Sequence, residues 1–138
     1  MNAICKFIGA VCPYGELAGR IGLAAIFLIS GLSKIGGYEG TQGYMESQGV
    51  PGFLLPLVII LEVGGGAALI VGWMTRWFAL ALAGFCVLAA LLFHFDFGNR
   101  LQQILFLKNI AIAGGLLVLC HAGAGRFSID KLRKSGDA

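Results

Sequence analysis

Residues 53–72 read FLLPLVIILEVGGGAALIVG, and this stretch decides the class of fold. Its length matches the roughly 20 residues that a helix needs to cross a bilayer. Glu62 is its only charged residue, and Pro56 falls near the start, where a helix tolerates proline best. Apolar residues follow one another without the strict alternation of a membrane-spanning strand. The stretch therefore predicts a transmembrane α-helix.

Three other stretches have a similar length and character, at about residues 17–36, 77–97 and 103–121. Glycine, proline or charged turns separate them, as in Gly36-Gly37, Pro51-Gly52 and Gly98-Asn99-Arg100. We therefore predict an all-α membrane protein, a four-transmembrane-helix bundle in which residues 1–138 form one domain. The weakly apolar residues 1–16 are interpreted as a short interfacial lead-in and not as a cleaved signal.

The composition supports a location within a bilayer. Apolar residues make up 58% of the chain and charged residues only 12%, against roughly 25% charged in a soluble domain. The net charge of +3 is small and is spread over ends and turns, which argues against nucleic-acid binding. We expect a multi-pass protein of the cell inner (plasma) membrane, with the lipid bilayer as its main partner.

The basic residues also predict an orientation. Lys6, Arg20, Arg76 and the basic tail at 126–134 fall on one side of a four-span bundle. The longest loop on the opposite side contains acidic residues instead. Since basic loops stay in the cytoplasm, both termini are expected to be cytoplasmic.

Ionisable residues persist inside the predicted spans, although each costs roughly 2.5–3.5 kcal/mol on insertion scales. In the first span, Arg20, Ser30 and Lys34 lie on one helical stripe. At 1.5 Å per residue, Glu62 lies roughly 13 Å below the outer surface and Lys108 roughly 8 Å below it. All four spans thus contribute to one polar layer in the outer half of the bilayer. Its members are Lys34, Glu62, His94, Asp96, Lys108 and Asn109, with Arg20 and Ser30 in supporting positions.

Two interpretations of this layer stay open. In the structural one, Glu62 pairs with Lys108, or as second choice with Lys34, and the pair fixes helix register. In the functional one, the layer lines a polar pocket in which His94 is a group that titrates near neutral pH. Residues 41–48 are expected to form a short surface helix, capped by Thr41 and with Tyr44 and Met45 facing lipid.

Several motifs resemble those of the DoxX family of four-helix inner-membrane proteins, and within it the YqjF group. They are the segment GLSKIGGYEGTQGYMESQGVPG, Glu62 with the following glycines, LFH ending at His94, LKN at Lys108-Asn109, and the terminal SIDKLR. The resemblance covers about residues 17 to 132. It implies kinship with membrane subunits of oxidoreductases, including quinone-linked ones. Redox chemistry is implied by that kinship alone.

Three hypotheses for function follow. The chain is a membrane subunit of a redox system that binds a quinone or a small sulfur compound and works with a soluble oxidoreductase partner. Alternatively it is a small-solute carrier or channel, although it is short and lacks an obvious inverted repeat, and a homo-oligomer could overcome the limit of size. The third hypothesis is a structural or assembly module without catalysis. No catalytic residue can be named, and the spacing of the four cysteines predicts no metal site.

Overall fold

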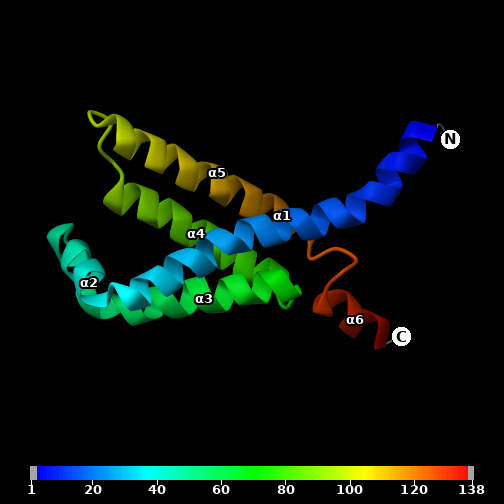
Figure 1. The fold of residues 1–138 in the computed structure, drawn as a ribbon, viewed down its shortest axis with the longest axis horizontal. Helices are drawn as coiled ribbons and strands as arrows, with labels where there is room; N and C mark the ends of the chain where they lie inside the picture. Colours follow the sequence, from blue (N-terminus) through cyan, green and yellow to red (C-terminus); the bar gives the residue numbers. More distant parts are fainter. Residues whose placement is uncertain (1–2, 137–138) are drawn as a thin grey trace.

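The structure is a computed structural model that describes residues 3–136, and this part of the chain is helical without strands (Figure 1). Its elements are α1 (Ala3–Gly36), α2 (Tyr38–Ser47), the 3₁₀ turn η1 (Gly52–Leu54), α3 (Leu55–Val71), α4 (Thr75–Phe93), α5 (Arg100–Ala122) and α6 (Ile129–Gly136). Within the described residues, four helical segments are long and apolar enough to cross a membrane: α1, η1 with α3, α4, and α5. The predicted all-helical class with four spans is therefore confirmed.

The four spans form two pairs. Helix α1 packs along α3, and α4 packs along α5, while α3 and α4 connect the pairs. The pairs diverge toward the end that carries α2 and the α4–α5 connection (Figure 1). Both termini lie at the opposite end, as expected for an even number of spans. The shared core contains Ala24, Phe27, Leu69, Leu82 and Leu116.

Glycines allow α1 and α3 to approach closely. A Cβ atom on Gly66 would lie 2.9 Å from Leu28 Cγ and 3.2 Å from the carbonyl oxygen of Ala24. Gly64, on another face of α3, has no neighbour within 4 Å of such an atom. Small residues at contact faces are the usual means of helix packing in membranes, where burial supplies little driving force.

Helix α1 extends beyond the predicted first span. It begins at Ala3, so residues 3–16 continue the helix where a short lead-in was expected. Figure 1 shows this N-terminal part turning away from the bundle, and Pro13 lies within it. Proline lacks the N–H of a helical hydrogen bond, which explains a bend at this point. Helix α4 in turn ends at Phe93, earlier than the predicted residue 97.

Arg20 attaches the C-terminal segment to the bundle. Its buried guanidinium donates hydrogen bonds to the backbone carbonyls of Ala124, Ile70 and Phe127, the last two at 3.2 and 2.6 Å. The sequence placed Arg20 in a supporting position of the polar layer. Here it lies at the other end of the bundle and fixes the chain that leads to α6.

Asp130 makes a second attachment at the same end. Its carboxylate accepts hydrogen bonds from the backbone N–H groups of Met74 and Thr75, at 2.8 and 2.9 Å. Burial by itself would raise the pKa of Asp130, but the two backbone hydrogen bonds, the Thr75 side chain and the charge of Arg133 together outweigh it, so the pKa lies below the usual value. The carboxylate thus holds the start of α6 against the first turn of α4.

Candidate functional site

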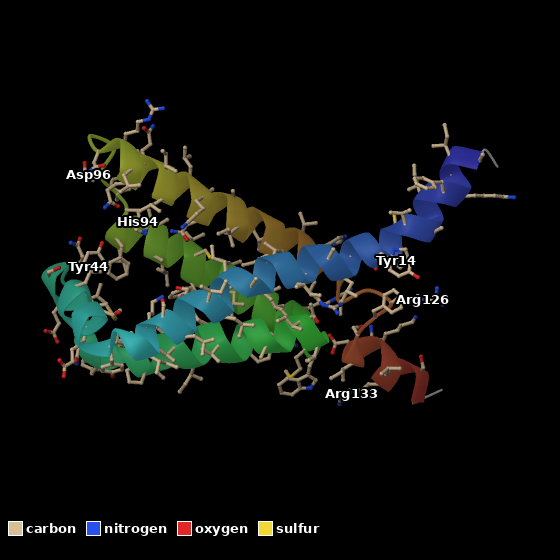
Figure 2. The ribbon with its side chains drawn as sticks, viewed as in Figure 1. Tyr14, Tyr44, His94, Asp96, Arg126 and Arg133 are labelled. Carbon is tan, nitrogen blue, oxygen red and sulfur yellow. The ribbon has the colours of Figure 1, made fainter. Side chains whose placement is uncertain are left out.

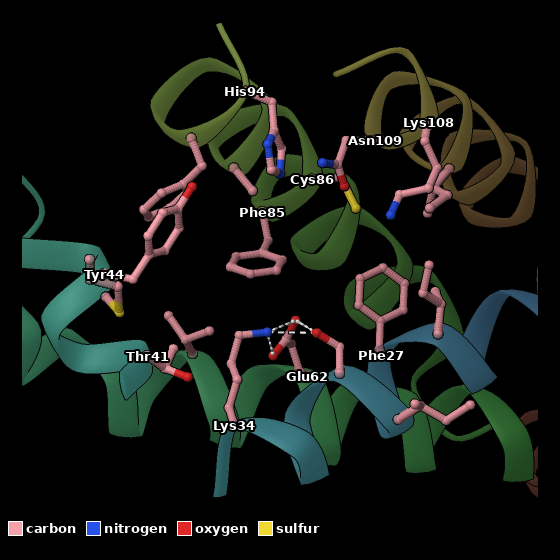
Figure 3. Close-up of a pocket in the computed structure, with 18 residues that line it drawn as sticks. Phe27, Lys34, Thr41, Tyr44, Glu62, Phe85, Cys86, His94, Lys108 and Asn109 are labelled. Carbon is pink, nitrogen blue, oxygen red and sulfur yellow. Dashed lines mark hydrogen bonds and ion pairs between the residues drawn. The ribbon is translucent and has the colours of Figure 1, made fainter. Parts of the chain in front are cut away.

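A cavity of about 620 Å³ lies between the two helix pairs, at the end where they diverge (Figure 3). Its walls are largely apolar, and aromatic rings from Phe27, Phe85 and Phe93 contribute to them. Polar side chains enter it from α1, α2, α3, α5 and the end of α4. A cavity of this size and character is typical of small-molecule sites.

One wall carries a buried ion pair. Lys34 Nζ on α1 lies 3.0 Å from Glu62 Oε1 and 2.8 Å from Glu62 Oε2 on α3. Ser30, one turn before Lys34, donates a hydrogen bond from Oγ to Glu62 Oε1 at 3.0 Å. Lys34 Nζ also donates to Ser30 Oγ at 2.6 Å. The Glu62 side chain is 4% exposed and that of Lys34 is 23% exposed, so the pair is held mainly inside the protein.

The two oxygens of Glu62 differ in their partners. Oε1 accepts hydrogen bonds from both Ser30 and Lys34. Oε2 is buried and has its lysine contact at ion-pair distance, but it accepts no hydrogen bond among the described residues. Buried polar atoms are nearly always hydrogen-bonded. For Oε2 that role falls to the Lys34 ammonium 2.8 Å away, and the oxygen is buried, so the carboxylate is satisfied within the protein.

The opposite wall is formed by the end of α4 and by α5. His94, Lys108 and Asn109 line the cavity there, across from the ion pair (Figure 3). His94 Nδ1 lies 2.7 Å from Gln102 Oε1, which fixes the ring of the histidine. With Gln102 oriented in this way, Nδ1 is the donor and Nε2 is the nitrogen left for another partner.

The structure brings together most of the predicted polar layer. Six of the named residues line one cavity: Ser30, Lys34, Glu62, His94, Lys108 and Asn109. Asp96 does not line it, because its carboxylate accepts a hydrogen bond from the backbone of Gly98 at 3.1 Å in the exposed α4–α5 turn. Arg20 is also outside it, since its guanidinium binds the C-terminal segment.

The preferred partner of Glu62 was wrong. Lys34 pairs with Glu62, whereas Lys108 lies across the cavity on α5 (Figure 3). The prediction compared depths along the membrane normal and ignored lateral position. Helix α1 packs directly on α3, while α5 packs on α4, so Lys34 is the lysine that the fold presents to Glu62.

Helix α2 contributes to the site in a way that the sequence did not reveal. Thr41, Tyr44 and Met45 line the cavity, and Met45 is buried, although Tyr44 and Met45 were expected to face lipid. The Tyr44 ring stacks on Phe93 with centroids 5.7 Å apart. Thr41 is likewise not the helix cap, because α2 begins at Tyr38 and the Thr41 hydroxyl donates to the carbonyl of Gly37. Aromatic and β-branched residues at helical spacing could have suggested an inward face.

Cys86 is a further lining residue, and its thiol is buried. It forms part of the apolar wall of the cavity. Across residues 3–136, no three histidine, cysteine or acidic side chains gather to form a metal site.

Comparison with known proteins adds the following relationships. Residues 15–95 match the family model DoxX. Inner membrane protein YqjF of Escherichia coli is 51% identical over 118 residues, which cover 86% of this chain and 91% of that protein. Inner membrane protein YphA of the same organism is 33% identical, covering 95% of this chain and 99% of the relative. CatD of Bacillus subtilis, provisionally named an oxidoreductase, is 33% identical and covers 72% of this chain and 77% of its own length. No solved structure matches the chain significantly.

Proposed function

Because this chain belongs to the DoxX family and is a multi-pass protein of the inner membrane, we propose that it binds a quinone in the cavity between the helix pairs. In this proposal it is the membrane subunit of a redox system. The observation that carries the proposal is the combination of apolar aromatic walls with polar groups on two facing walls, the Lys34–Glu62 ion pair on one and His94, Lys108 and Asn109 on the other.

The chemistry of a quinone fits such a cavity. Its ring is flat and apolar and can stack on side chains such as Phe85 and Phe27. Its two carbonyl oxygens lie at opposite ends of the ring and accept hydrogen bonds. The Asn109 amide and the Lys108 ammonium are donors on the α5 wall, and the Lys34 ammonium faces them across the cavity in its contacts with Ser30 and Glu62. An isoprenoid tail would leave the cavity between the helices and enter the lipid.

Reduction of a quinone to a quinol takes two electrons and two protons. In this proposal a soluble oxidoreductase partner supplies the electrons and water supplies the protons. CatD, a relative of this chain, is itself provisionally named an oxidoreductase. The quinol hydroxyls would then donate hydrogen bonds where the quinone accepted them. His94 Nε2 is an acceptor on the wall opposite the ion pair, so the cavity offers a partner to the reduced form as well.

The proposal includes an orientation. Both termini lie at one end of the bundle, together with Arg76 and the basic residues of α6. By the distribution of basic residues this end is cytoplasmic, which places the cavity in the outer half of the bilayer. A quinone would then enter from the bilayer core, and a partner on the outer face would reach it near α2.

Filling the cavity tests the proposal. Ala89 lines the cavity, while Ala81 on the same helix is exposed away from it. We expect isothermal titration of the detergent-solubilised chain with ubiquinone-1 to show saturable binding. Ala89→Trp should weaken that binding at least about tenfold, the effect of losing about 1.4 kcal/mol, and Ala81→Trp should leave it unchanged. Absence of saturable binding to the native chain, or equal effects of both variants, would contradict the proposal.

A further inference from the structure

We propose that a second site, at the end of the bundle that carries both termini, binds the phosphate headgroup of an anionic phospholipid. A cavity of about 1040 Å³ lies there between the first turn of α4, the α5–α6 connection and α6. Figure 2 shows Arg126 and Arg133 at this end, far from the quinone cavity that His94 and Tyr44 mark. The proposal is independent of quinone binding.

Positive charge dominates the lining of this cavity. Its basic members are Arg76, Arg126, Lys131, Arg133 and Lys134, and its acidic members are Glu16 and Asp130. Both oxygens of Asp130 are already engaged by backbone N–H groups of Met74 and Thr75. None of the five basic side chains forms an ion pair with another residue of the 3–136 segment. Their charges are therefore available to an external anion.

Exposed apolar side chains stand beside these charges. On α6, Leu132 is 72% exposed and lies between Lys131 and Arg133, and Ile129, the first residue of the helix, is also exposed. Trp77, in the first turn of α4, is 70% exposed and lines the same cavity. A short helix with basic and apolar faces, next to an interfacial tryptophan, is typical of a segment that lies at the headgroup level of a bilayer.

This combination favours a lipid over other anions. Free phosphate would use the basic groups but not the apolar ones, and an acidic protein segment would leave Leu132 and Ile129 uncovered in the membrane interface. An anionic phospholipid uses both, since its phosphate meets the arginines and its acyl chains run past Trp77 along the bundle. Arg20 and Asp130 hold α6 in position for this contact.

Native mass spectrometry of the full chain in mild detergent tests the proposal. With phosphatidylglycerol and phosphatidylcholine at equal concentrations, we expect preferential retention of phosphatidylglycerol. Each basic side chain removed should weaken that binding about fivefold, so the Arg133→Gln/Lys134→Gln variant should bind roughly 20-fold to 30-fold less tightly. Arg100→Gln is the matched control, because Arg100 is an exposed basic residue at the opposite end.

Two further measurements separate the sources of the anion. Leu132→Ser should weaken binding of phosphatidylglycerol. The response of this variant to inorganic phosphate should be the same as that of the native chain. Millimolar inorganic phosphate should not displace the lipid. Equal retention of the two lipids, complete displacement by phosphate, or an equal loss in Arg100→Gln would each overturn the proposal. If the site bound an acidic protein segment instead of a lipid, the two lipids would be retained equally.

Discussion

Removing the Lys34 ammonium should destabilise the bundle more than removing the charge of Glu62. In Lys34→Met, a carboxylate whose side chain is 4% exposed keeps only the hydroxyl of Ser30 as a partner. Breaking a buried ion pair in this way costs about 3–5 kcal/mol of unfolding free energy. In Glu62→Gln, the remaining lysine is 23% exposed and has a flexible stem, so it can turn toward a more polar environment. We expect a smaller loss there, about 1–3 kcal/mol.

The double variant Lys34→Met/Glu62→Gln should lose less than the sum of the two single losses. It leaves no uncompensated charge, and a coupling energy of at least about 2 kcal/mol is expected for groups in direct contact. Reversible unfolding in mixed micelles with increasing SDS, followed by near-ultraviolet circular dichroism, gives the required free energies. Lys108→Met is the control and should change stability by about 0.5 kcal/mol or less, because Lys108 is exposed and forms no ion pair within residues 3–136.

Additive losses for Lys34 and Glu62 would refute this reasoning, and so would coupling of Glu62 to Lys108. The cycle also distinguishes the two interpretations of the polar layer. A double variant that folds but no longer binds quinone supports a ligand site. A double variant that folds and retains native quinone affinity would mean that the pair only fixes helix register.

Three other predictions concern packing, pH and topology. Gly66→Ala should destabilise the α1–α3 contact by about 1–3 kcal/mol, because the added Cβ atom would press on Leu28. Gly64→Ala is the control and should be neutral or stabilising. Equal SDS unfolding midpoints for the two variants would contradict this packing. The folded pKa of Asp130 is lowered, so its stabilisation is complete above the unfolded pKa of about 4 and is lost as the pH falls through the lower folded value. The difference in Tm between the native chain and Asp130→Asn should therefore shrink below about pH 4, and a constant difference would contradict the attachment of α6. Reporter fusions that require the cytoplasm should be active in the α3–α4 turn and after α6 but inactive in α2, and the opposite pattern would reverse the orientation.

The spans could be predicted because membrane helices are encoded locally. A run of the kind found at 53–72 cannot satisfy its backbone in lipid except as a helix. The convergence of polar groups was also predictable, because depth along a span follows from residue count. The residues at this depth that the helix arrangement also turns toward the cavity are Ser30, Lys34, Glu62, His94, Lys108 and Asn109.

Lateral arrangement could not be derived in the same way. Depth does not say which helices are neighbours, so it favoured Lys108 over Lys34 as the partner of Glu62, whereas the fold pairs Glu62 with Lys34. The inward face of α2 depends on contacts with α4, such as Tyr44 on Phe93, that one-dimensional spacing does not contain. The use of Arg20 as an attachment for the C-terminal segment required knowing that residues 124–127 return to the first helix.

Photoaffinity labelling tests the central claim of a quinone cavity most directly. The solubilised full chain is incubated with an azido-quinone, illuminated, digested and mapped by mass spectrometry. We expect labelling of cavity residues, such as Phe85, Phe93 or Tyr44, and excess unlabelled quinone should suppress it. Labelling confined to lipid-facing residues such as Leu57 and Ile60, and unaffected by competition, would contradict it.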